Sequence, residues 1–337
     1  MPKVRVLVHL GPMKTGTSAF AAHLSRRAAA GTLPNHIVYP TGDLWFPAQG
    51  GIVKHHDLVE VAPEKIKVRG ERRRTTDATP ETIRDRFALI TQRARDRGED
   101  ALVVFVCELA DQRATPELGK ILSEYFDSVD FAIVAREQVS AVRSLLGQQI
   151  RMWNRTKVVS LESQDFVRQH FRRGSYDYAR LWQKWTPTNS DYRVHFVPYR
   201  NGESTDDLSQ DIFSAVGFGD FPHSPDLLGG ERIHSSVSTN RMADLARIKR
   251  WSNSMSAIPG ALSLGKWLFD RTLGRAHSQI AQNRGGNFTT WKLSPSEQDF
   301  IRSAYRESNE AFKRQLGATA DEPRWRAWFD STLGTST

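Results

Sequence analysis

VRVLVHLGPMKTGTSAFAAHLSRRAAA, residues 4–30, is the stretch that decides the fold. Val4 to Leu10 is a short run of β-branched and aliphatic residues, which is typical of a buried strand. Residues 11–17 then form a loop that contains two glycines, a proline and a lysine. From Ser18 to Ala30, strong helix formers carry an apolar stripe. The stretch therefore predicts a buried strand, a loop and a helix in direct succession.

Strands and helices alternate along much of the remaining chain. Further strands are expected at residues 36–39, 101–107, 131–135 and 192–198, and helices at 79–97, 138–153, 162–170, 176–185, 206–216 and 295–316. Most of the chain from residue 238 onward reads as helical. Alternation of this kind predicts an α/β fold with three layers, in which helices cover both faces of a central parallel sheet.

Composition limits the class of protein and its partners. The 337 residues carry a net charge of +9, which suits a phosphorylated nucleotide, a membrane face or nucleic acid as a partner. Cys107 is the only cysteine, so no intrachain disulfide forms and a reducing compartment is expected. No apolar run reaches the roughly 20 residues that span a bilayer, and no signal-peptide pattern is present. These features favour a cytoplasmic location.

The loop at residues 11–18 has the chemistry of an anion site. Backbone N–H groups at the start of a helix have no partner within the helix and bind anions well. Gly16 allows a close backbone approach, Lys14 supplies a point charge, and Thr and Ser hydroxyls donate hydrogen bonds. Because a strand precedes the loop and a helix follows it, we interpret it as a phosphate loop.

The position of the lysine separates this loop from the usual nucleoside-triphosphate loop. That motif is G-x-x-x-x-G-K-[ST], whereas Lys14 comes two residues before Gly16. No strand ends clearly in an Asp suited to Mg²⁺, and Glu108 comes nearest. An ATP-dependent kinase with a variant phosphate loop therefore stays as the alternative interpretation.

Residues 9–20, HLGPMKTGTSAF, resemble the 5′-phosphosulfate loop of the sulfotransferase superfamily, in its bacterial and carbohydrate-type branch. The pattern in that family is approximately G-P-x-K-[TSG]-G-[TS]-[ST]. The resemblance implies that Lys14 contacts the phosphosulfate and stabilises charge on the departing phosphate. It also implies that the donor is held by Gly11, Lys14, Thr15, Gly16, Thr17 and Ser18.

A second stretch resembles the part of the family that binds the 3′-phosphate. Residues 131–150, FAIVAREQVSAVRSLLGQQI, place Arg136 at the end of a strand and Ser144 eight residues later. Residues 137–139 depart from the family, where many members carry an acid or Asn followed by Pro; both expected ligands are kept. Residues 283–286, which include Arg284, are a loose counterpart of the basic loop that completes the 3′-phosphate site in many members.

The resemblance implies a fold, a donor and a reaction. The fold is the P-loop NTPase-like sulfotransferase fold with extra C-terminal helices. We expect one domain over residues 1–337, with a nucleotide-binding core in about 1–220 and a mostly helical part in about 221–337. The donor would be 3′-phosphoadenosine 5′-phosphosulfate, the product adenosine 3′,5′-bisphosphate, and no metal would be required. The acceptor, which could be a carbohydrate, a lipid or a small molecule, and the oligomeric state are not readable from the sequence.

A general base must take the proton of the acceptor's hydroxyl or amine. Residues 54–57, Lys-His-His-Asp, resemble the family's short Lys- and His-bearing stretch, so His55 and His56 are candidates; Glu108 is the carboxylate alternative. The histidine pair is narrowly favoured, because a neutral imidazole accepts a proton at physiological pH. His9, His195 and His234 are expected to be structural. No nucleic-acid module is recognised, and contact with a membrane is expected only if the acceptor is a lipid.

Overall fold

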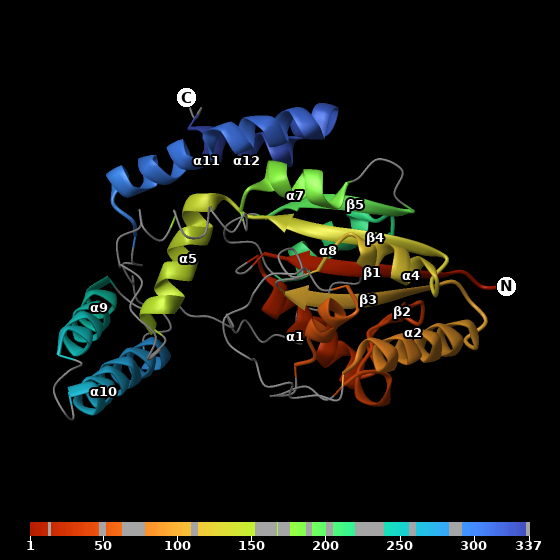
Figure 1. Ribbon diagram of the computed structural model, residues 1–337, viewed down its shortest axis with the longest axis horizontal. Helices are drawn as coiled ribbons and strands as arrows, with labels where there is room; N and C mark the ends of the chain where they lie inside the picture. Colours follow the sequence, from red (N-terminus) through yellow and green to blue (C-terminus); the bar gives the residue numbers. More distant parts are fainter. Residues whose placement is uncertain are drawn as a thin grey trace. The chain divides into compact units, whose positions relative to one another are not determined.

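The computed structural model describes residues 1–12, 15–46, 52–62, 78–108, 114–151, 167, 176–186, 191–199, 205–219, 239–255, 261–282 and 292–334 (Figure 1). These residues form two compact units. The first comprises residues 1–137, 173–230 and 307–337, and the second comprises 138–172 and 231–306. The boundary expected near residue 220 falls outside the described residues.

The first unit contains a five-stranded sheet. Its strands are β1 (Val4–Gly11), β2 (Ile37–Val38), β3 (Ala101–Glu108), β4 (Ser128–Ala135) and β5 (Tyr192–Pro198). They are all parallel and lie in the order β2-β3-β1-β4-β5, with β1 in the centre. The α/β fold with a parallel sheet is therefore confirmed. The fourth strand begins three residues earlier than predicted, because a buried aspartate, Asp130, interrupts its apolar pattern.

Helices cover both faces of this sheet. On one face lie α1 (Thr17–Ala29) and α8 (Thr205–Ala215), and on the other α2 (Pro80–Arg95), α4 (Glu117–Ser123) and α7 (Tyr178–Trp185). Three ring pairs illustrate the packing: Phe20 with Phe213, Phe87 with Phe105, and Trp185 with Phe131. The predicted start of α2 is confirmed, since Thr79 forms a capping box with Thr82 and Pro80 occupies the first turn.

The C-terminal part of the first unit packs beside β5. It comprises the end of α11 (Pro295–Leu316), the 3₁₀ helix η4 (Gly317–Asp321) and α12 (Pro323–Leu333). Phe312 of α11 contacts the rings of Phe196 and Trp328, and the Trp328 indole N–H donates a hydrogen bond to the Ala135 carbonyl at 2.9 Å. The C-terminal helices thus fix the carboxyl end of β4.

The second unit is helical in its described part. It contains α5 (Gln138–Arg151), α9 (Thr239–Ser254), α10 (Ala261–Gln282) and the first half of α11. Helix α9 packs against both α5 and α10. Of the helix predicted at residues 162–170, only Val167 is described. Among the described helices of both units, none is long and apolar enough to cross a membrane.

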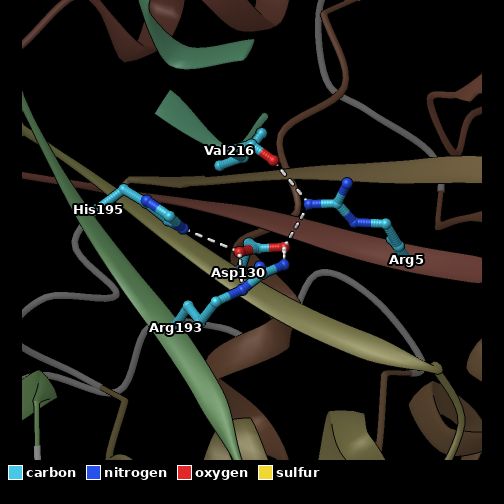
Figure 2. Close-up of polar contacts among 5 residues, drawn as sticks. All are labelled: Arg5, Asp130, Arg193, His195 and Val216. Atoms are coloured by element: carbon cyan, nitrogen blue, oxygen red, sulfur yellow. Dashed lines mark hydrogen bonds and ion pairs between the residues drawn. The ribbon is translucent and has the colours of Figure 1, made fainter. Parts of the chain in front are cut away.

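A buried carboxylate joins three strands of the sheet (Figure 2). Asp130 of β4 is fully buried, and Arg5, Arg193 and His195 donate hydrogen bonds to its two oxygens at 2.8 to 3.0 Å. Arg5 also donates to the Val216 carbonyl at 2.7 Å, beyond the end of α8. Burial alone would raise the pKa of Asp130, but these hydrogen bonds outweigh it and leave the pKa below its ordinary value.

We predict that Asp130→Asn lowers the free energy of unfolding by about 1.5–3 kcal/mol at pH 7, because Arg5, Arg193 and His195, which are partly exposed, lose the buried carboxylate that accepts their hydrogen bonds. The matched substitution is Asp299→Asn, which removes a carboxylate that is 75% exposed and paired with Arg302; it should cost less than about 1 kcal/mol. Urea unfolding of the two variants and the wild type measures both values. Equal losses would show that Asp130 is no more important than a surface ion pair.

Candidate phosphate-binding site

The carboxyl ends of β1, β3 and β4 bring the predicted site residues to one edge of the sheet. Gly11 and Glu108 end β1 and β3 and lie opposite each other in the strand register. Arg136 follows Ala135, the last residue of β4. Ligands of open parallel sheets bind beyond these ends, so this edge is the candidate site.

Both glycines of the loop lie where a side chain would collide with neighbouring atoms. Gly16 has φ of 83°, and a Cβ there would lie 2.5 Å from the Cδ2 atom of Leu208. A Cβ on Gly11 would lie 2.2 Å from the Thr17 hydroxyl and 2.9 Å from the Cε1 atom of His9. Close packing around the loop therefore requires glycine at both positions.

The threonine hydroxyls of the loop are directed inward. The Thr15 hydroxyl donates to the Pro12 carbonyl at 2.8 Å and lies 3.4 Å from the Thr17 hydroxyl, and both side chains are buried. Helix α1 begins with no side-chain cap and no acidic residue in its first turn. The first turn therefore presents backbone N–H groups and the positive end of the helix dipole, while these hydroxyls hold the loop together.

Gly16→Ala should destabilise the protein more than Gly98→Ala does. Both glycines have positive φ, but a Cβ at Gly98 meets nothing within 4 Å, so that variant reports backbone strain alone, roughly 1–3 kcal/mol. At Gly16 the collision with Leu208 adds an overpacking cost of about 1–3 kcal/mol. Chemical unfolding of both variants measures the difference; equal losses would mean that the loop floor yields freely.

Lys54 connects the phosphate loop to the end of β3. Its ammonium donates to the Ser18 hydroxyl at 2.8 Å and to Oε2 of Glu108 at 2.9 Å. About a fifth of each charged side chain is exposed, so the pair is accessible from the edge of the sheet. The sequence analysis assigned no role to Lys54, although its position directly before the two candidate histidines indicated that it could lie in the same site.

His55 is part of the sheet edge. Its backbone N–H donates to the Val106 carbonyl at 2.8 Å, and its ring Nδ1 accepts the Val106 N–H at 3.0 Å. The Nε2–H donates to the Pro40 carbonyl at 3.0 Å. The residue thereby continues the pairing of β3 beyond the two-residue strand β2. It also places its neighbours, Lys54 and His56, beside the end of β3.

The environment of His55 rules out the expected role as a base. The ring is fully buried, and burial lowers its pKa to about 3. Both nitrogens are engaged with backbone groups, so none is available for an acceptor's proton. We therefore correct the prediction and assign His55 to the structure. His56 is half-buried in the 3₁₀ helix η3 (His56–Glu60), next to Lys54.

The other histidines were expected to be structural. His195 donates to Asp130, as described above. His9 is fully buried beneath the loop and contacts the Phe20 ring; within the described part of the chain its nitrogens have no hydrogen-bond partner. Burial lowers the pKa of His9 to about 4, so the ring is neutral near pH 7. His234 lies outside the described residues.

Stability should fall as the pH drops below about 6.5, because His9 and His55 stay neutral in the folded protein down to pH values of about 4 and 3, whereas their unfolded forms bind protons. Each ring contributes a loss of roughly 2 kcal/mol between pH 7 and pH 5. Unfolding measured at several pH values should reveal proton uptake by two groups, and His55→Gln should remove one of them. An unchanged slope in that variant would contradict the assignment.

Arg136 is held firmly at the end of β4. Its backbone N–H donates to the Tyr178 hydroxyl, which in turn donates to the Arg136 carbonyl, both at 2.8 Å. The guanidinium lies 4.9 Å from the centre of the Tyr199 ring. The same ring borders the loop, since a Cβ on Gly16 would lie 3.5 Å from its Cε2 atom. Tyr199 thus lies between the two predicted phosphate-binding elements.

Three predicted ligands are not placed in this site. Ser144 lies on α5 in the second unit, whereas Arg136 belongs to the first, so their pairing stays a prediction. Lys14 and Arg284 lie outside the described residues. What the described residues bring together is the backbone at Gly11 and Gly16, the Ser18–Lys54–Glu108 contact, and Arg136 beside Tyr199.

The fold and site define an α/β protein with a glycine-containing loop between its central strand β1 and helix α1. No family model matches the chain, and no curated protein matches it. The crystal structure of a sulfotransferase from Alicyclobacillus acidocaldarius is similar over 97% of this chain and 99% of that one, with 13% identity and a TM-score of 0.39. The sulfotransferase domain from the curacin biosynthetic pathway is similar over 70% and 81%, with 14% identity and a TM-score of 0.36. At these values neither likeness establishes family or activity.

Proposed function

We propose that this protein is a sulfotransferase, which moves a sulfuryl group from 3′-phosphoadenosine 5′-phosphosulfate to a hydroxyl or amine of an acceptor. The observation that carries the proposal is the arrangement at the edge of the sheet. There the start of α1, which has no side-chain cap, and Arg136, whose backbone is hydrogen-bonded to Tyr178, lie on either side of the Tyr199 ring. The proposed donor carries phosphate at both its 5′ and 3′ positions, so it needs two such elements. The loop would bind the phosphosulfate, and Arg136 with Ser144 the 3′-phosphate.

The donor's charges fit the residues on this edge. Bare backbone at Gly11 and Gly16 admits phosphate oxygens, and the dipole of α1 favours their negative charge. Arg136 offers a planar fork of donors, and its backbone is fixed by Tyr178, so little freedom is lost on binding. In this proposal Lys14 stabilises charge on the departing phosphate.

The acceptor's proton would pass to Glu108, which we propose as the general base in place of His55. Its Oε2 atom lies 2.9 Å from the Lys54 ammonium, and about a fifth of its side chain is exposed, so an acceptor could reach it. Once Glu108 is protonated, its attraction for Lys54 weakens, and the ammonium becomes available to stabilise negative charge at the transferring group. His56, next to Lys54, is the second candidate for the base.

This arrangement weakens the kinase interpretation, because it engages the carboxylate that was expected to bind Mg²⁺ in a kinase. Glu108 was the nearest counterpart of a carboxylate for Mg²⁺, but it is bound to Lys54. A carboxylate neutralised by an ammonium is a weaker ligand for a divalent cation. The two functions predict different nucleotides: adenosine 3′,5′-bisphosphate without metal for a sulfotransferase, and ATP with Mg²⁺ for a kinase.

Adenosine 3′,5′-bisphosphate should bind without metal, and Arg136→Ala should weaken its binding about tenfold to a hundredfold, which is the usual effect of losing a charge-assisted hydrogen bond. Isothermal calorimetry measures this, with Arg180→Ala as the control because Arg180 is exposed on α7 and outside the site. Preference for ATP with Mg²⁺, or equal binding by both variants, would overturn the proposal and favour a kinase.

Glu108→Gln should reduce kcat by about 10²–10⁴ with little change in bisphosphate binding, since it keeps the shape and removes the base. His56→Gln should reduce it far less. The rate is followed as release of the bisphosphate from the donor in the presence of a phenol, a monosaccharide or a phospholipid headgroup. If His56→Gln has the larger effect, His56 is the base and Glu108 only positions Lys54.

A further inference from the structure

The second unit exposes large apolar side chains on two neighbouring helices. Trp251 of α9 is 40% exposed, and Leu264 and Trp267 of α10 are 50% and 53% exposed. Apart from Met1, no other large hydrophobic residue in the described part of the chain is exposed to this degree. Large apolar side chains that are exposed on two helices packed together make these helices a candidate site of interaction.

Each tryptophan has an arginine one turn away on its own helix. Leu264, Trp267 and Arg271 follow the helical spacing of a single face, and the Arg271 guanidinium lies 5.2 Å from the centre of the Trp267 ring. On α9, Arg247 precedes Trp251 by four residues and is exposed. We call Arg247, Trp251, Leu264, Trp267 and Arg271 the hairpin surface.

The apolar members of the hairpin surface lie toward the connection between the helices. Helices α9 and α10 pack together, and only residues 255–260 separate them in the sequence (Figure 1). Trp251 is near the end of α9, and Leu264 and Trp267 are near the start of α10. Arg247 and Arg271 are therefore one turn farther from the connection, which gives an apolar end bordered by cations.

The charge of this hairpin is strongly positive. Residues 239–282 contain seven Lys and Arg against two Asp, a net charge of +5, which is more than half of the +9 of the whole chain. Both aspartates are paired within the hairpin, Asp244 with Arg247 at 3.6 Å and Asp270 with Lys266. The partner of this surface should therefore be anionic as well as apolar.

We propose that the hairpin surface binds peripherally to a lipid membrane that contains anionic headgroups. Tryptophan rings are favoured at the boundary between headgroups and acyl chains, and adjacent Arg side chains attract lipid phosphates. A second copy of this chain would bring the same positive charge against it. Nucleic acid would satisfy the arginines but leave the aliphatic Leu264 in water.

The test is flotation of the full chain with vesicles of neutral phosphatidylcholine, alone and with about a third phosphatidylserine. The protein should bind the anionic vesicles, and binding should weaken as salt rises. The double variant Leu264→Ser, Trp267→Ala should bind about tenfold to a hundredfold more weakly, because its apolar contact is lost. Arg247→Gln with Arg271→Gln should lose about tenfold or more.

The matched control is Arg306→Gln with Arg314→Gln, which removes the same charge from exposed positions of α11 and should bind nearly as the wild type does. Circular dichroism should find all variants folded, since every changed side chain is exposed. The proposal is overturned if the wild type does not float. It is also overturned if the control loses as much binding as the hairpin variants, or if the apolar variant binds unchanged and instead loses self-association. Each outcome is independent of the sulfotransferase proposal.

Discussion

The hydrogen bonding of β1 to both β3 and β4 is the constraint on which the rest of the structure depends. Parallel pairing on each side of one strand aligns three carboxyl ends, so Gly11, Glu108 and Arg136 reach the same edge from distant positions in the sequence. Asp130 fixes the other end of this arrangement, since its buried carboxylate accepts hydrogen bonds from Arg5 of β1 and Arg193 of β5. Stability and site geometry thus share two strands, β1 and β4.

The site combines rigid packing with exposed charge. Beneath the loop, Gly11 and Gly16 leave no spare volume, and the buried hydroxyl of Thr15 is already bonded within the loop. Above it, Lys54 and Glu108 remain partly exposed. The tightly packed loop and the partly exposed ion pair therefore lie at the same edge of the sheet.

His55 and His56 show what could not be predicted from the sequence alone. His55 and His56 are adjacent and chemically identical, and nothing local distinguishes them. The difference arises because β2 stops after two residues and the edge of β3 is completed by the ring and backbone of His55. Burial then lowers the pKa of that ring, while its neighbour stays half-buried. Lys54 gained its role in the same way, through contacts with residues 36 and 54 positions away.

The sequence by itself determined the α/β class, the strand–loop–helix order at residues 4–29 and the position of an arginine after β4, because hydrophobic period, glycine placement and element order are local properties. Tertiary structure decided which polar groups meet: the Asp130 cluster inside a strand, the Ser18–Lys54–Glu108 contact, and Tyr199 between the loop and Arg136. It also decided that Trp251, Leu264 and Trp267 stay exposed. Burial and pairing depend on strand order and helix packing, which bring together residues that no local pattern connects.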